Sequence, residues 1–131
     1  MKQEDKELLL KDLCARLPYD VMVNVDDYDT EKLIGIENET ITTKATPTSY
    51  SDKGEYPIDI VKPYLRPMSS MTEEEKREYK HLIAFSGNPI GSANLIDWLN
   101  KKMFAYHTID DKDMFELGLA IEVTEYNNPY K

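Results

Sequence analysis

One cysteine and two histidines are the residues of this sequence best suited to act as a nucleophile, a general base or a metal ligand. Cys14 shares a helical face with Leu13 and Leu17, which predicts a buried thiol and not a nucleophile. His81 and His107 have no cysteine or second histidine at zinc-ligand spacing. The sequence therefore predicts no metal site, no cofactor and no catalytic residue. A closed pocket that holds His107 beside an acid would favour an enzyme instead.

Carboxylates gather in one short segment of the first half, where alternate acids resemble the start of an EF-hand calcium loop. The cluster comprises Asp20, Asp26, Asp27, Asp29 and Glu31. An EF-hand loop that began here would need glycine at its sixth position and glutamate at its twelfth, but Lys32 and Asn38 stand there. The cluster predicts a solvated hairpin turn, with a weak cation site as the alternative.

Aromatic and arginine side chains on a stiff support form a further candidate site, because such residues often anchor protein interfaces. Tyr64, Leu65 and Arg66 stand between two prolines that restrict the backbone, and Trp98 and Tyr106 follow in the second half. Groups of this kind lose little side-chain freedom on docking. We predict that these five residues bind a partner protein. The structural alternative places Trp98 in the core and Tyr64 with Leu65 over a sheet edge.

The charge balance restricts the class of partner. Sixteen Lys and Arg residues against 25 Asp and Glu residues give a formal net charge of −9 and a pI near 4.7. Proteins that bind nucleic acid or anionic membranes usually present a basic stripe, so both partner classes are disfavoured. A cationic protein surface suits the charge better. Interspersed basic residues argue against an acidic DNA mimic. They are Lys76, Arg77, Lys80, Lys101 and Lys102.

Length, apolar runs and cysteine usage point to one cytoplasmic domain. A chain of 131 residues suits a single domain with a single core. The apolar run at residues 8–10 is too short for a signal-peptide core or a membrane span. A lone cysteine cannot form an internal disulfide, which agrees with a reducing compartment.

Apolar periodicity predicts a helix and a small sheet in the first half of the chain. Leucines at helical spacing over residues 6–17 indicate a helix that Pro18 ends, with its charged residues, Asp12 and Arg16 among them, on the wet face. Alternating or β-branched residues predict four short strands. The strands are expected at residues 21–25, 32–37, 40–45 and 56–61, with an exposed loop at 46–54.

Helix signals dominate the second half. Thr72 and Glu75 form a capping box for a helix that reaches about residue 85. Ser92 can cap a second helix, whose last turn carries Lys101 and Lys102. The predicted buried stripe of that helix comprises Leu95, Ile96, Trp98, Leu99 and Met103.

We therefore expect an α+β fold in one domain over residues 1–131. Its parts are a helix (1–17), an antiparallel sheet of three or four strands that could close like a barrel (20–61), a proline-stiffened connector (62–71), a mainly helical part (72–123) and a loose tail (124–131). Within the helical part, Asp110 or Asp111 can begin a short last helix before an extended stretch at residues 119–123.

Four pieces of the sequence resemble signatures of a family of small uncharacterised proteins carried by phages and mobile elements of gut bacteria. The pieces are residues 11–19, 61–75, 97–100 and 118–122, about a third of the chain. The resemblance implies a mobile-element setting, but it implies no reaction, ligand or catalytic residue. This chain departs from the family pattern in a longer segment from His107 to Asp113 and in Lys101-Lys102-Met103, which replaces a run richer in histidine.

Two functions follow as hypotheses. The first is a non-enzymatic accessory protein of a phage or mobile element that binds a partner protein. The second is an anti-defence protein that sequesters a host factor or a small signalling nucleotide. A nucleotide trap needs a pocket with basic and aromatic side chains, so a cleft that contains Arg66, His81 or Lys102 would favour it.

Overall fold

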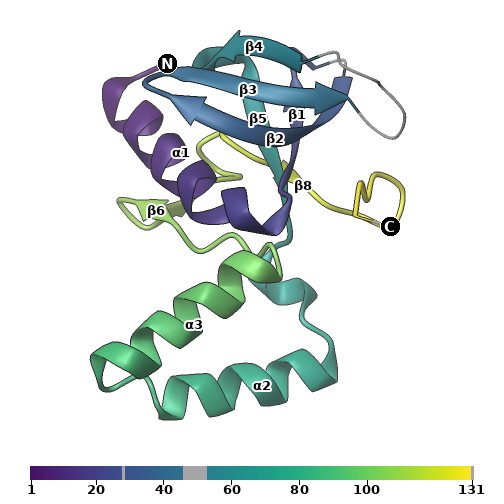
Figure 1. The fold of residues 1–131 in the computed structure, drawn as a ribbon. Coiled ribbons are helices and arrows are strands. Elements are labelled where there is room, and N and C mark those ends of the chain that lie inside the picture. Colours follow the sequence, from purple (N-terminus) through teal and green to yellow (C-terminus); the bar gives the residue numbers. More distant parts are fainter. Residues whose placement is uncertain (28, 46–52, 131) are drawn as a thin grey trace.

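A six-stranded mixed sheet and helix α1 form one part of the molecule, and a pair of helices projects from it as a second part (Figure 1). The computed structural model describes residues 1–27, 29–45 and 53–130. We call residues 72–102 the helical hairpin and the other described residues the sheet body. The α+β class predicted from the sequence is confirmed.

The large sheet is open and has more strands than predicted. Its strands are β1 (Met22–Val25), β2 (Asp29–Glu37), β3 (Thr40–Ala45), β4 (Lys53–Pro57), β5 (Val61–Leu65) and β8 (Ile121–Glu122). Their order is β4-β3-β2-β1-β5-β8, antiparallel throughout except for the parallel pair of β5 and β8. Because β4 and β8 are the two edges, the expected barrel-like closure is wrong. Three or four strands were expected, and six are present.

The connector predicted at residues 62–71 begins as an inner strand of this sheet. Proline is disfavoured inside strands because it lacks the backbone N–H, yet Pro63 lies in β5. In the sheet, Pro63 pairs with Val23 of β1, while β8 meets β5 only at Tyr64 and Leu65. The strand predicted at 56–61 is divided by a 3₁₀ turn, η2, at Ile58–Ile60.

The hydrophobic core lies between α1 (Gln3–Arg16), one face of the sheet and the chain that follows the helical hairpin. Val23 and Val25 of β1 are buried in it. Met22 and Asn24 on the other face of β1 are buried as well, so the one buried face that the period of two predicts is wrong. The other buried members of the core are Leu9, Leu13, Val21, Leu33, Ile41, Ile58, Val61, Leu65, Met103, Ala105, Met114 and Leu119. The core therefore belongs entirely to the sheet body. Residues 46–52 of the loop predicted at 46–54 lie outside the described residues, and the prediction is wrong for Lys53 and Gly54, which begin β4.

The helical hairpin consists of α2 (Glu73–Ala84) and α3 (Pro89–Lys101). The predicted capping box of α2 is present: the Thr72 hydroxyl accepts from the Glu75 N–H at 3.1 Å, and the Glu75 carboxylate accepts from the Thr72 N–H at 2.9 Å. The predicted cap of α3 at Ser92 is wrong. Asn88 caps it instead, because its side-chain oxygen accepts from the Gly91 N–H and proline is favoured at the next position.

The predicted last helix from Asp110 or Asp111 is replaced by a small β-hairpin. Strands β6 (Thr108–Ile109) and β7 (Lys112–Asp113) pair across these two aspartates, whose φ values are 51° and 64°. A two-residue turn of this kind needs positive φ at both positions, and aspartate tolerates it better than most residues. The extended stretch expected near residue 121 is present as β8.

The chain leaves the sheet body and returns to it at the same place. The Arg66 N–H donates to the Met103 carbonyl at 2.7 Å, and the Ala105 N–H donates to the Arg66 carbonyl at 2.9 Å. These bonds form a parallel bridge between Arg66 and Phe104. The helical hairpin is therefore inserted between two paired segments. Among the helices of the described residues, none is both long and apolar enough to span a membrane.

Candidate functional site

An arginine–glutamate pair connects the helical hairpin to the sheet body. The Arg66 guanidinium, half-buried after β5, donates to both carboxylate oxygens of Glu75 in α2, at 2.8 and 2.7 Å. The hydrogen bonds from Arg66 hold the pKa of the Glu75 carboxyl at about 2, although burial alone would raise it. The same guanidinium lies 4.2 Å from the centroid of the Phe104 ring, a cation–π contact.

Aromatic rings continue this contact into the hairpin. Trp98 of α3 stacks on Phe104 at 5.6 Å between ring centroids and on Tyr79 of α2 at 6.0 Å. The Trp98 indole N–H donates to the Glu78 carboxylate at 2.9 Å. We call Arg66, Glu75, Trp98 and Phe104 the joint, because they link the two parts of the molecule.

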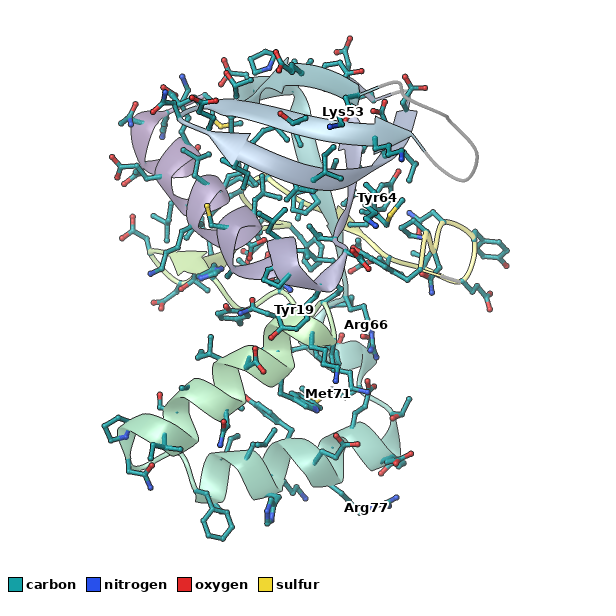
Figure 2. All side chains as sticks on the ribbon, in the orientation of Figure 1. Tyr19, Lys53, Tyr64, Arg66, Met71 and Arg77 are labelled. Atoms are coloured by element: carbon teal, nitrogen blue, oxygen red, sulfur yellow. The ribbon has the colours of Figure 1, made fainter. Side chains whose placement is uncertain are left out.

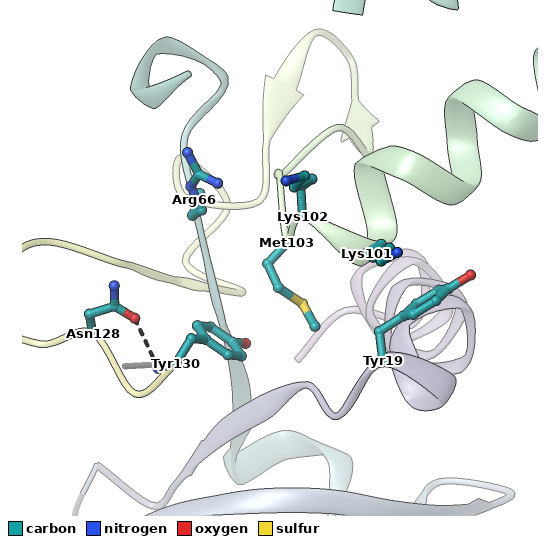
Figure 3. A pocket seen from close by; sticks show the side chains of 7 residues that line it. All are labelled: Tyr19, Arg66, Lys101, Lys102, Met103, Asn128 and Tyr130. Atoms are coloured by element: carbon teal, nitrogen blue, oxygen red, sulfur yellow. Dashed lines mark hydrogen bonds between the residues drawn. The ribbon is translucent and has the colours of Figure 1, made fainter. Parts of the chain in front are cut away.

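A cavity of about 430 Å³ opens beside the joint (Figure 3). Its basic residues are Arg66, Lys101 and Lys102, and its aromatic residues are Tyr19 and Tyr130. Met103 and Asn128 complete the lining. The sequence did not predict this cavity, because its walls come from chain segments that are distant in sequence.

A buried ionic cluster lies where α1 meets the chain that follows the hairpin. Arg16 and Asp12, both 0% exposed, form a two-hydrogen-bond pair at 2.9 and 3.0 Å. Arg16 also donates to the Phe104 carbonyl, and His107 Nδ1 lies 2.8 Å from the Asp12 carboxylate. Burial alone would raise the pKa of Asp12, but the hydrogen bond with His107 and the charge of Arg16 hold it below its usual value.

The prediction that Asp12 and Arg16 lie on the wet face of α1 is wrong, and so is the prediction that Cys14 is buried. Cys14 is exposed, whereas Leu9, Leu13 and Arg16 face the core. Charged residues occur all around this helix, so its sequence does not define the buried face clearly. An error of one residue in assigning that face rotates it by about 100°. The Asp12–Arg16 spacing of four was the available signal for this pair.

His107 does stand beside an acid, the arrangement that would favour an enzyme if a pocket held it. A cavity of about 470 Å³ is lined by Tyr106 and Thr108, the two residues that flank His107 in the chain. Neither His107 nor Asp12 lines this cavity. Asp12 also accepts from Arg16, which donates to the Phe104 carbonyl as well and whose Nη1 has no hydrogen-bond partner among the described residues. These hydrogen bonds hold the Asp12 carboxylate between Arg16 and His107.

The five residues predicted to bind a partner occupy different depths. Tyr64 and Leu65 are 8% and 0% exposed within an inner strand, and not over a sheet edge, so their side chains offer little surface. Tyr64 lies within the sheet, and Arg66 follows the end of β5, between the sheet and the helical hairpin (Figure 2). Trp98 and Tyr106 are half-buried. The structure therefore brings Arg66 and Trp98 together through Phe104.

The acidic cluster is distributed over a turn and a strand. Asp26 and Asp27 form the turn after β1 with φ values of 53° and 62°, while Glu31 is buried in β2 and accepts a hydrogen bond from the Thr43 hydroxyl. The hairpin turn predicted here is present between β1 and β2. Within the described ranges, no three His, Cys, Asp or Glu side chains are arranged to hold a metal ion.

Apolar side chains are exposed mainly on the helical hairpin. Among the described residues, the exposed large apolar side chains are Met1, Ile83, Phe85, Ile90, Ile96 and Tyr126. Ile90 is 76% exposed and Ile96 39%, which makes the prediction of a buried Ile96 wrong. Ile96 also lines a shallow hollow of about 460 Å³ on α3, whose other lining residues are Pro89, Ser92, Ala93, Asp97 and Asn100.

Comparison of the chain with protein-family models, curated proteins and solved structures finds no match.

Proposed function

We propose that this protein is a non-enzymatic accessory protein of a phage or mobile element that binds a partner protein through the outer face of α3. The observation that carries the proposal is the exposed apolar surface of this helix, on the side that does not pack against α2. The mobile-element setting rests on the sequence resemblance alone. The lone cysteine supports a reducing, cytoplasmic location.

The composition of the two helices supports this choice of face. Helix α2 has seven charged residues among twelve, as expected for a solvated helix, whereas α3 has only Asp97 and Lys101 among thirteen. A helix that is apolar on all sides is normally buried on all sides. One side of α3 packs through Trp98 and Leu99, and the opposite side carries Ala93 and Ile96 without such cover.

The occupant that fits is an amphipathic helix with basic flanks. Helix α3 is about 20 Å long at 1.5 Å per residue, so it offers a face of several helical turns. Residues 72–102 contain five acidic and five basic side chains, so the whole net charge of −9 lies in the rest of the chain. A partner helix on α3 would place its apolar side on Ile96 and its basic side toward the acidic sheet body.

Titration of the protein with a synthetic 18-residue leucine–lysine amphipathic peptide tests this proposal. Trp98 is the only tryptophan of the chain and lies on α3, so its fluorescence reports binding. We expect saturable binding that Ile96→Ser weakens at least tenfold. Ile83→Ser is the matched control, because Ile83 is similarly exposed but belongs to α2, and we expect its affinity to stay within twofold of wild type.

Two further peptides define the failure of the proposal. A scrambled peptide of the same composition and a leucine–glutamate peptide should both bind at least tenfold more weakly. Equal binding of the scrambled peptide, or equal losses in Ile96→Ser and Ile83→Ser, would contradict docking on α3. A dimer in light scattering that Ile96→Ser converts to a monomer would assign the face to a second copy of the chain instead.

A further inference from the structure

The cavity beside the joint is basic although the protein is strongly acidic. Lys101 and Lys102 end α3, and Arg66 follows β5, so three cationic side chains meet at one opening. Figure 3 shows the Lys102 side chain directed toward Arg66, with Met103 between the rings of Tyr130 and Tyr19. A cavity of about 430 Å³ is within the usual size range of small-molecule sites.

The charges at this opening are only partly balanced. Glu75 is fully engaged by Arg66 and lies 4.0 Å from the Lys102 ammonium, so one carboxylate serves two cations. Lys101 is exposed and has no ion-pair partner among the described residues. An excess of positive charge therefore remains at the mouth of the cavity, which attracts an anion.

Polar and aromatic groups around these cations suit a ligand with more than a charge. The Asn128 side-chain oxygen accepts from the Tyr130 N–H at 2.9 Å, which directs its amide N–H₂ group to other acceptors. The Tyr130 hydroxyl donates to the Tyr64 carbonyl and accepts from the Met22 N–H, so this ring is held in place. Residues 124–131 were predicted to form a loose tail, but Tyr130 attaches this segment to the sheet through the same two hydrogen bonds. The Tyr19 ring, held through its hydroxyl by Asp97, forms the opposite wall.

We propose that this cavity binds a small phosphate ester that carries an aromatic ring, of which a nucleotide is the representative class. Lys101 and Lys102 pair with the phosphate oxygens, and Asn128 donates to them or to the sugar. The ring of the ligand packs against Tyr19. The residues that contact this ligand differ from those of the outer face of α3, and the two sites meet only where Asp97 of that face accepts from the Tyr19 hydroxyl. Binding of ADP and binding of the peptide are therefore measured separately.

Calorimetric titration with ADP, adenosine and inorganic phosphate tests the site in the full-length protein. We expect ADP to bind saturably with a dissociation constant below 1 mM and each fragment to bind at least tenfold more weakly. The double variant Lys101→Ala/Lys102→Ala should lower ADP affinity at least tenfold. The matched control, Lys76→Ala/Lys80→Ala, removes the same charge from α2 and should change it less than twofold.

The acidic surface makes these outcomes decisive, because a net charge of −9 disfavours unspecific binding of anions. Absence of saturable ADP binding would overturn the site. Equal losses in the two double variants would also overturn it, since they would indicate a general charge effect. If the proposal holds, Tyr19→Leu lowers ADP affinity at least fivefold. If phosphate binds as tightly as ADP and Tyr19→Leu leaves ADP affinity unchanged, the proposed contact between the ligand ring and Tyr19 is wrong.

Discussion

The sheet body and the helical hairpin differ in how they are stabilised. The sheet body contains every member of the buried hydrophobic cluster and the whole net negative charge of the chain. The hairpin is electrically neutral and exposes isoleucine and phenylalanine side chains. An element without a core depends on its attachment, so the hairpin is held in place by the joint and by its helix caps.

The largest effect should come from the buried ionic cluster of the sheet body. Asp12→Ala leaves the Arg16 guanidinium buried without its carboxylate, which should lower the free energy of unfolding by about 3–5 kcal/mol. Urea unfolding followed by far-UV circular dichroism and by Trp98 fluorescence measures this. We expect both transitions to move together. Lys11→Ala, at an exposed position of the same helix, is the control and should stay within about 0.5 kcal/mol of wild type. A Trp98 transition that did not move would show that the hairpin is stable by itself.

The second-largest effect should be a separation of the unfolding transitions of the helical hairpin and the sheet body. Glu75→Ala removes the pair with Arg66 and half of the capping box, at a cost of about 2–3 kcal/mol. Because the lost contacts belong to the joint, the Trp98 fluorescence transition should move to lower urea than the far-UV transition. Glu74→Ala changes an exposed neighbour in the same turn and should keep the transitions coincident. Coincident transitions in Glu75→Ala would contradict attachment through the joint.

Lowering the pH should weaken the Arg66–Glu75 pair and reduce stability by a smaller amount than Glu75→Ala does. The pKa of Glu75 is about 2 in the folded protein against 4.5 as its ordinary value. The unfolded chain therefore binds more protons between pH 4.5 and 2, and stability falls as the pH is lowered through this range. Wild type and Glu75→Gln should differ in stability at pH 6 and converge near pH 2. The same difference at both pH values would indicate that the ionised carboxylate contributes nothing.

The smallest effect should be confined to the hairpin. Asn88→Ala removes the cap of α3 and should lower the stability of this helix by about 1 kcal/mol. Hydrogen exchange of the α3 amides measures it, and amides of β1 should be unaffected. Asn94→Ala, at an exposed position inside α3, is the matched control and should not weaken protection. An equal change in β1 would show that the two parts open together.

Local signals in the sequence predicted much of this fold. The capping box at Thr72 and Glu75 and the strands near residues 21–25 and 40–45 depend on neighbours within a few residues, and all three are present. Burial of β1 on both faces, against the one buried face that its alternation predicted, depends on distant segments. Strand β5 was missed because Pro63 is tolerated only where no second strand covers it, a property of the tertiary sheet.

The candidate sites were harder to predict because distant segments build them. The approach of His107 to Asp12 joins residues 95 positions apart, and the cavity joins Tyr19, Arg66, Lys102 and Tyr130. Arg66 and Lys102 were named as residues whose presence in a cleft would favour a nucleotide ligand, but periodicity contains no information about that cleft. Contacts of this kind follow from topology.

The parallel bridge between Arg66 and Phe104 fixes how much chain must separate these two residues. Parallel neighbours cannot be joined by a tight turn, because the chain has to return to the start of the next segment, which takes about a dozen residues or more. The helical hairpin is therefore part of a crossover connection between two segments of the sheet body, and a two-residue turn could not replace residues 67–103. The same stretch also supplies Met103 to the core.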